Sequence, residues 1–193
     1  MNAIRPLDPP RHGAWMQTAS GYCVDLHAPD LEMLRLTEIA TSLSRIARFL
    51  GHTHGPCAYS VAQHSCHVAD LLADQPLAVR RAGLLHDAHE ALIGDLPTPV
   101  KQLLGRDLVR GAESAVHIAM FARFGLSAEL MDHPLIKQVD LIMLATERRD
   151  LMRRSAWAWG ELPEPASMPT LEPWAANEAY MEFLNRAERL GLI

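Results

Sequence analysis

One stretch decides how this chain is interpreted: Gly83-Leu-Leu-His-Asp-Ala-His-Glu-Ala-Leu-Ile-Gly-Asp-Leu-Pro-Thr-Pro-Val-Lys101. It begins as an apolar helical run and ends in a loop punctuated by prolines. Charged groups are almost never buried unless they are paired or bound to a metal. A His-Asp pair directly after an apolar Gly-Leu-Leu therefore indicates that other polar groups converge on it. The groups in this stretch that can bind metal or move protons are His86, Asp87, His89, Glu90 and Asp95.

Length and composition indicate one folded domain. The chain has 193 residues, of which 49% are hydrophobic and 21% charged, and this is enough for a single substantial core. No internal repeat or linker divides the sequence. We therefore expect a single domain over residues 1–193, with an irregular or hairpin segment at 1–30 and a proline-rich surface loop at 160–173.

Charge and targeting signals restrict the partners and the compartment. A net charge of −5 disfavours binding of polymeric nucleic acid, although a small phosphate ligand needs only local cations. The three cysteines, Cys23, Cys57 and Cys66, show no Cys-x-x-Cys spacing and suit a reducing compartment. The N-terminus lacks the apolar segment of a signal peptide, and no run of about 18 apolar residues occurs. We expect a soluble cytoplasmic protein with no membrane partner.

The spacing of apolar residues predicts an all-α protein of about six to seven helices. Gly13 to Leu26 favours a short hairpin that turns at Ser20-Gly21. Ser60-Val-Ala-Gln63 has the form of a capping box, and Gly94 and Gly125 are typical helix stops. The expected helices cover residues 34–50, 60–73, 76–94, a short segment from 98, 107–124, 134–159 and 172–190.

Two polar residues outside the central stretch also face the expected core. His64 has Val61 three residues before it and Val68 four residues after it, so it lies in the apolar stripe of its helix. Taken alone, it would be a core histidine that is hydrogen-bonded to a carbonyl. Asp140 has Met143 three residues after it and points inward in the same way. An ionised aspartate in such a place is costly unless a cation or hydrogen-bond donors satisfy it.

Three expected helices thus each direct metal-binding side chains inward, namely His64, the His86-Asp87 pair and Asp140. Neighbours on a helix point about 100° apart, so the His86-Asp87 pair can close on one ion. We therefore predict an enclosed metal site with two histidine and two aspartate ligands. These ligands suit one divalent ion of Mn, Co, Fe, Zn or Mg, and the lack of a thiolate disfavours a structural zinc site.

The order of these ligands resembles the H…HD…D signature of the HD-domain metal-dependent phosphohydrolases. Longer strings resemble the bacterial and prophage HD-domain 5′-nucleotidases, and the resemblance covers roughly residues 15 to 185. The His-Asp pair alone is a weak motif, but it is fairly specific when Gly-Asp-Leu-Pro-Thr-Pro-Val-Lys follows it. The strings are Arg48-Phe49, then Tyr-Ser-Val-Ala-Gln-His-Ser at 59–65, the residues 86–101, and Asp-Leu-Ile-Met-Leu-Ala-Thr-Glu-Arg-Arg-Asp-Leu at 140–151.

The resemblance implies an HD-domain helical bundle that holds one divalent metal and hydrolyses (deoxy)ribonucleoside 5′-monophosphates to nucleoside and phosphate. By position, Glu90 and Asp95 match two acidic residues beside the substrate and the attacking water. Arg48 matches the phosphate-binding arginine of the family, although its spacing to His64 is one residue longer here. The positions that match the metal ligands are His64, His86, Asp87 and Asp140.

The residues themselves leave several roles open. Glu90 follows the first histidine of the central stretch by four residues, so it acts as a general acid or base there or forms a salt bridge with an arginine. Asp95 could orient water, protonate the leaving ribose oxygen, bind a sugar hydroxyl or simply form a turn. Arg48 competes with Arg45 for the phosphate. Lys101 would add a cation at a helix N-terminus.

Two further features bear on the site. Some HD enzymes hold a second metal through histidines in the interval that contains His117 and His133. A single metal fits better here, because His133 precedes a helix start and His117 lies on a helix with an ordinary pattern. Glu147 belongs to a dense charge cluster that is typical of a solvated helix face. Because Glu147 follows Asp140 by seven residues, it could reach the rim of the site or a partner subunit.

We therefore expect a metal-dependent phosphomonoesterase with a small-molecule nucleotide or phosphate ester as its substrate. One alternative is an HD hydrolase of another phosphorylated metabolite, such as a nucleoside triphosphate or an alarmone. A polyphosphate would need more cations near the site than the sequence clearly offers. A second alternative is a non-catalytic, metal-stabilised binding module. A homodimer is also open, since helical proteins of this size with exposed apolar stripes often dimerise, but the sequence identifies no interface.

Overall fold

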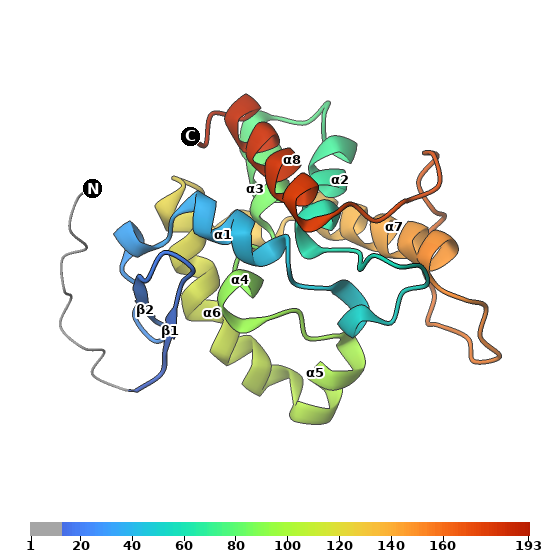
Figure 1. Cartoon of the computed structure of the whole chain (residues 1–193), viewed down its shortest axis with the longest axis horizontal. Helices are drawn as coiled ribbons and strands as arrows, with labels where there is room; N and C mark the ends of the chain where they lie inside the picture. Colours follow the sequence, from blue (N-terminus) through green and yellow to red (C-terminus); the bar gives the residue numbers. More distant parts are fainter. Residues whose placement is uncertain (1–12) are drawn as a thin grey trace.

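The computed structural model describes residues 13–193, so the first twelve residues of the irregular or hairpin segment expected over 1–30 lie outside them. Helices dominate the described part, as Figure 1 shows. The two strands, β1 (Trp15–Gln17) and β2 (Cys23–Asp25), pair antiparallel with Met16 opposite Val24. The all-α class and the short N-terminal hairpin are therefore both confirmed.

The α-helices of the described part differ widely in length, from a single turn to five turns. Three short 3₁₀ segments connect them at η1 (Leu31–Met33), η2 (Arg48–Gly51) and η3 (Ala128–Asp132). The α-helices are α1 (Leu36–Leu43), α2 (Val61–Leu71), α3 (Leu77–Leu85), α4 (Glu90–Ile93), α5 (Thr98–Leu104), α6 (Arg106–Arg123), α7 (Pro134–Leu151) and α8 (Ala176–Arg189).

Helix α2 lies at the centre of the fold and packs against α3, α7 and α8. Ser60 caps it, because the Ser60 side chain accepts a hydrogen bond from the Gln63 backbone N–H at 3.2 Å. The Gln63 amide does not close the capping box. Its side chain instead donates to the Glu172 carbonyl and accepts from the Trp174 N–H, both at 2.8 Å. These bonds fix the segment before α8 against the start of α2.

Gly83 allows α3 to lie close to α2. A Cβ atom at Gly83 would meet the Leu72 Cδ1 atom at 2.4 Å, which real side chains do not tolerate. The buried apolar side chains of the described residues form one continuous cluster that includes both helices. The close approach brings the C-terminal end of α3, where His86 follows, next to His64 on α2.

The helix expected over residues 34–50 is shorter than predicted, since α1 ends at Leu43. The chain then becomes extended, and Ala47 pairs with Ser60 in an antiparallel bridge. Phe49 and Leu50 follow with φ values of 55° and 53°, which side chains other than glycine rarely adopt. The apolar spacing continued through this segment, but pairing with the start of α2 replaced the helix.

The helix expected over residues 76–94 is interrupted at 86–89, between α3 and α4. The His86 ring donates from Nδ1 to the Gly83 carbonyl at 2.8 Å. The next backbone hydrogen bonds span three residues, as in a 3₁₀ turn, and not the four of an α-helix. They run from the Ala88 N–H to the Leu85 carbonyl and from the Glu90 N–H to the Asp87 carbonyl. The His86-Asp87 pair therefore sits on a turn between two helices and not within one helix. Gly94, with a φ of 83°, ends α4 as expected.

The helix expected over residues 134–159 ends at Leu151 in the structure. The carbonyl of Leu151 accepts from the His54 backbone N–H at 2.9 Å, and the Asp150 carboxylate accepts from the Leu171 N–H at 3.0 Å. These tertiary bonds turn the chain into a loop over 152–175, longer than the predicted 160–173. Within residues 13–193, none of the helices has the length and apolar character needed to cross a membrane.

Candidate metal centre

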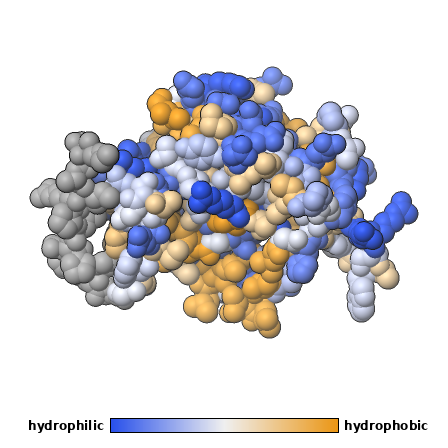
Figure 2. All heavy atoms as spheres, in the orientation of Figure 1, coloured by the Kyte–Doolittle hydropathy of each residue, from blue (hydrophilic) through white to orange (hydrophobic). Residues whose placement is uncertain are grey.

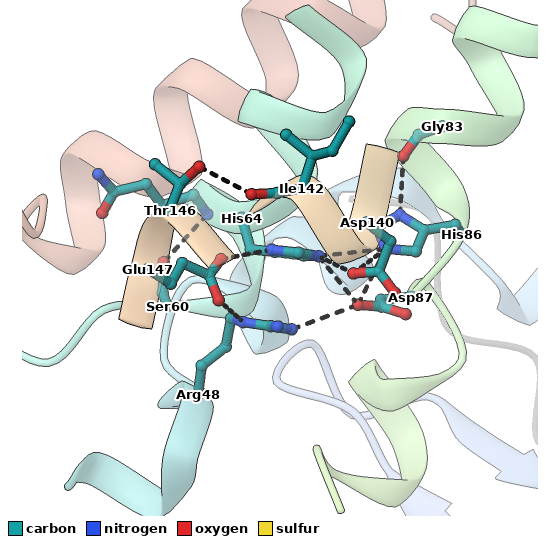
Figure 3. A network of polar contacts seen from close by, with 11 residues as sticks. Arg48, Ser60, His64, Gly83, His86, Asp87, Asp140, Ile142, Thr146 and Glu147 are labelled. Carbon is teal, nitrogen blue, oxygen red and sulfur yellow. Dashed lines mark hydrogen bonds and ion pairs between the residues drawn. The ribbon is translucent and has the colours of Figure 1, made fainter. Parts of the chain in front are cut away.

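Four side chains from three parts of the chain converge beside α2, as Figure 3 shows. His64 comes from the middle of α2, His86 and Asp87 from the turn between α3 and α4, and Asp140 from α7. The structure therefore brings together all four residues that the sequence suggested as metal ligands. His64 is fully buried, whereas the side chain of Asp140 is 40% exposed and forms the open side of the group.

The ligand atoms lie at separations that suit one shared ion. The Nε2 atom of His64 is 3.1 Å from Asp140 Oδ1 and 3.2 Å from His86 Nε2. The His86 Nε2 atom is 3.2 Å from Asp87 Oδ2. Ligand atoms that lie about 2.0–2.2 Å from a divalent ion are themselves roughly 3–4 Å apart. His64, His86 and Asp87 each offer one ligand atom, and these atoms all lie within 4.8 Å of one another.

Outer hydrogen bonds hold both imidazole rings in the orientation that metal binding needs. His64 donates from Nδ1 to the Glu147 carboxylate at 2.6 Å, and His86 donates from Nδ1 to the Gly83 carbonyl at 2.8 Å. Each neutral ring then presents the Nε2 lone pair to the centre. Two lone pairs and two carboxylates thus face one another. A divalent cation satisfies this set of acceptors, so the residues fit a bound metal.

The carboxylates also control the charge of the two rings. Burial and the nearby Arg48 lower the pKa of His64, but Glu147 and Asp140 outweigh them and raise it to about 9. Burial would raise the pKa of Asp87, yet His86, His64 and Arg48 hold it well below its usual value. The centre is therefore a strongly anionic pocket that attracts positive charge, whether it is a proton or a metal ion.

Arg48 points into this pocket from η2. Its Nε atom lies 3.1 Å from Glu147 Oε2 and its Nη1 atom 3.6 Å from Asp87 Oδ2. Burial would lower the pKa of Arg48, but Glu147 and Asp87 raise it, so the guanidinium stays charged. Arg45, the competing candidate, is exposed and faces the cavity between the hairpin and α1 instead.

The two acidic candidates lie beside the ligands. Glu90 opens α4 and is only 5% exposed, and its Oε2 atom has no hydrogen-bond partner among the described residues. Burial, together with Asp87 and Asp95, raises the pKa of Glu90 well above its usual value. The pKa of Asp95 is raised as well, chiefly by burial. Lys101, on α5, lies 3.0 Å from Glu113 and is paired with it.

Three further histidines, His89, His117 and His133, have different partners from the four candidate ligands. The rings of His89 and His117 stack on each other with their centroids 4.4 Å apart. Burial lowers the pKa of His89 to about 4 and that of His117 to about 3. His133 precedes α7, and its buried Nδ1 atom has no hydrogen-bond partner among the described residues.

The sequence analysis predicted the place of Glu147 only in part. The charge cluster was typical of a solvated helix face, but Glu147 is fully buried and contacts both His64 and Arg48. Its spacing of seven residues from Asp140, which suggested that it could reach the rim of the site, was the better guide, because residues seven apart on a helix share a face. Its neighbour Arg149 does lie at the surface, paired with Asp150.

Comparison with known proteins places the chain among relatives without giving it an activity. No family model matches it. It is 40% identical over 121 residues to an uncharacterized protein of Rhodobacter capsulatus, an alignment that covers 61% of each chain, so less than two thirds of that relative is spanned. It is also 40% identical over 158 residues to the uncharacterized protein YfdR of Escherichia coli (strain K12), covering 81% of this chain and 84% of YfdR. The chain therefore belongs to the family of YfdR.

Proposed function

We propose that this protein is an HD-domain metal-dependent phosphohydrolase that converts nucleoside 5′-monophosphates to nucleoside and phosphate. The observation that carries the proposal is the centre itself: two imidazoles with fixed Nε2 lone pairs, two carboxylates and a mostly buried arginine directed at them. A histidine that serves only to pack the core needs one hydrogen-bond partner, and it does not need two carboxylates and a second imidazole facing its Nε2 atom. The family resemblance of the sequence motifs supports the phosphohydrolase reaction class.

His64, His86, Asp87 and Asp140 would hold one divalent ion. When bound, such an ion supplies Lewis acidity toward water and toward a phosphoryl oxygen. Glu147 and the Gly83 carbonyl keep the two rings in the required tautomer. The open side formed by Asp140 leaves room for a ligand to approach.

Arg48 would bind the phosphate of the substrate. Its Nε and Nη1 atoms face Glu147 and Asp87, which fixes the plane of the guanidinium next to the metal ligands. A planar, permanently charged fork matches two phosphate oxygens better than a lysine does. Placed at the ligand atoms, it would neutralise charge that develops on the phosphoryl group.

Glu90 and Asp95 would move the protons. In the hydrolysis, the oxygen of water forms a bond to phosphorus and the bond from phosphorus to the ribose oxygen breaks. The water must lose a proton and the ribose oxygen must gain one. Burial raises the pKa of both Glu90 and Asp95, so each holds a proton more readily than a solvent-exposed carboxyl group and can exchange it with a reacting oxygen. Glu90, as the more deeply buried group, is the better acid or base, and Asp95 the better candidate to orient water or the ribose.

The charges near the centre favour a monophosphate over a triphosphate or alarmone. Arg48 is the cation in contact with the ligand group, while Lys101 is already paired with Glu113. Several carboxylates surround the centre and would repel additional phosphates. A polyphosphate would therefore be bound less well than a single phosphate group.

The experiment measures phosphate release from a panel of ribo- and deoxyribonucleoside 5′-monophosphates. Metal-stripped protein is assayed after addition of Mn²⁺, Co²⁺, Mg²⁺ or Zn²⁺, beside the isosteric variant Asp87→Asn. We expect release that depends on the metal and disappears in the variant. Metal binding is measured separately by titration calorimetry. Tight metal binding without phosphate release from any monophosphate would rule out the proposal, and release only from triphosphates or alarmones would replace it with the alternative substrate class.

A further inference from the structure

A cavity of about 270 Å³ lies between the N-terminal hairpin and α1, and none of the four candidate metal ligands lines it. Figure 1 shows the hairpin beside α1, and Figure 2 shows hydrophilic and hydrophobic residues mixed on this part of the surface. The Ser20 backbone N–H and hydroxyl group both donate to the Glu38 carboxylate, which holds the hairpin on α1. We call this space the hairpin cavity, and its walls come from both strands, η1, α1, α4 and α6.

The walls of the hairpin cavity are mainly aliphatic. No phenylalanine, tyrosine or tryptophan is among the described residues that line it, so a planar ring would find no aromatic face to stack on. Methionine side chains are flexible and adapt to the shape of a ligand. A flexible aliphatic chain therefore suits these walls better than an aromatic ring does. The larger apolar residues of the lining are Met16, Val24, Met33, Leu34, Ile39, Ile46, Leu92 and Met120.

The charged residues of the lining lie on α1 or beside its two ends, and most of them are already engaged. The Glu38 carboxylate accepts from Ser20, and the Arg35 Cζ atom lies 4.4 Å from the centroid of the Tyr22 ring. Arg45 is exposed and has no carboxylate partner among the described residues. Exposed arginines are often unpaired, but this one borders an apolar cavity. A ligand that combines an apolar body with one negative charge matches both features.

The size of the hairpin cavity restricts the ligand further. Small-molecule sites usually measure about 300–1,000 Å³, so 270 Å³ suits a ligand at the small end of this range. One water takes about 30 Å³, so the space corresponds to a ligand of about ten non-hydrogen atoms. The lining positions from Arg35 to Ser42 rise over about 10 Å of helix. An extended saturated chain of about eight carbons has a similar length, and with its carboxylate oxygens it has about ten non-hydrogen atoms.

We propose that the hairpin cavity binds an aliphatic carboxylate of about eight carbons, with its chain between the hairpin and α1 and its carboxylate on the Arg45 guanidinium. Binding removes the chain and the aliphatic walls from water, which is favourable in proportion to the area buried. Glu38 lies about two helical turns before Arg45, which keeps the two carboxylates apart. This second small-molecule site does not rest on the proposed hydrolytic reaction.

Titration calorimetry of the full chain with sodium octanoate tests the proposal. We expect one site with a dissociation constant on the order of 100 µM, as is usual for a ligand of this size. Octan-1-ol keeps the chain without the charge, and benzoate keeps the charge without the chain. Each should bind at least about tenfold more weakly than octanoate. No binding of octanoate up to about 10 mM would overturn the proposal, and so would equal binding of either comparison compound.

A second titration, after removal of bound metal, separates the hairpin cavity from the metal centre. The dissociation constant of octanoate should be unchanged, because Arg45 and the aliphatic walls do not depend on a metal. If octanoate binding were lost with the metal, its carboxylate would be a metal ligand and the proposal would be wrong.

Two variants locate the ligand within the fold. Arg45→Gln removes the cation, so it should weaken octanoate binding at least about tenfold and leave octan-1-ol binding unchanged. Its control is Arg153→Gln, because Arg153 is also exposed and does not line the cavity. Met16→Glu places a carboxylate in the wall and should weaken the binding of both compounds. Its control is Trp15→Glu on the same strand, because Trp15 is 47% exposed against 43% for Met16 and does not line the cavity.

Circular dichroism checks that each variant is folded. Octanoate binding that a folded Arg45→Gln or Met16→Glu protein retains in full would overturn the proposal. Displacement of octanoate by a nucleoside 5′-monophosphate would overturn it as well, because the hairpin cavity would then belong to the proposed substrate site.

Discussion

Two pairs of histidines, each made of one buried and one partly buried ring, have opposite character in this fold. His64 and His86 face each other with their Nε2 atoms 3.2 Å apart, and carboxylates surround them. The carboxylates outweigh burial and raise both pKa values. His89 and His117 are stacked face to face, and burial lowers both pKa values. One pair attracts cations, whereas the other behaves like neutral aromatic packing.

The two histidine pairs differ because different side chains surround their rings. The Nδ1 atom of His64 has the Glu147 carboxylate as its acceptor, while the Nδ1 atom of His89 has no hydrogen-bond partner among the described residues. An imidazole becomes a good metal ligand when an outer acceptor fixes its proton and other ligands share its open side. A histidine count along the sequence therefore says less about a metal site than the carboxylates that reach the same point.

The largest expected effect is a loss of metal affinity that occurs when the surroundings of His64 and His86 are changed and not when the stacked pair is changed. Asp87→Asn keeps the shape of the side chain but removes the charge that draws a cation between His64 and His86. We expect metal affinity to fall by more than about 100-fold, beyond the range that outer contacts control. His89→Phe should leave the affinity unchanged. Calorimetric titration with Mn²⁺ measures both. Equal losses in the two variants would contradict the assignment of ligands.

A smaller effect is expected at Glu147, which contacts the candidate ligand His64 and would not itself bind the proposed metal. Glu147→Gln retains an oxygen that can accept the His64 Nδ1 proton but loses the charge that supports this ring and Arg48. We expect metal affinity to fall by about 10- to 100-fold. The same titration measures it, with His117→Phe as the control. If Glu147→Gln bound metal as tightly as the wild type, Glu147 would be a structural partner of Arg48 only.

The smallest effect concerns the stacked pair. The folded pKa of His117, about 3, lies below the usual value near 6.5, so the unfolded chain binds a proton more readily. Glu113 and Asp87 favour the charged form, but His89 and burial prevail. The contribution of His117 to stability is therefore complete above pH 6.5 and declines as the pH falls toward 3, by up to about 1.4 kcal/mol per pH unit.

His117→Phe should remove this decline while keeping the stack with His89. Urea unfolding of metal-free protein at pH 7 and pH 5 measures the free energy of unfolding of both forms. The difference between the two pH values should be smaller in the variant than in the wild type. An identical pH dependence would mean that His117 is protonated in the folded protein, and the contrast between the two pairs would disappear.

The sequence predicted the class of the fold and indicated four residues that do converge in space, but it extended two helices too far and missed the break in a third. Apolar residues at helical spacing continued past Leu43 and past Leu151, and no local signal marked either end. The structure ends α1 because Ala47 pairs with Ser60, and it ends α7 because His54 and Leu171 bond to its last residues. Each of these partners lies far away in the sequence, so periodicity alone could not reveal them.

The sequence by itself determined which residues are forced inward. His64 and Asp140 occupy the apolar faces of their helices, and the His-Asp pair follows a run that had to be buried, so convergence followed from spacing and the cost of buried charge. Tertiary structure alone decided which charged groups and hydrogen-bond acceptors surround these residues. Glu147 and Gly83 fix the two rings from different helices, and Arg48 enters from the short 3₁₀ segment η2. Hydrogen bonds depend on the position of each atom in space, and the order of residues does not give that position.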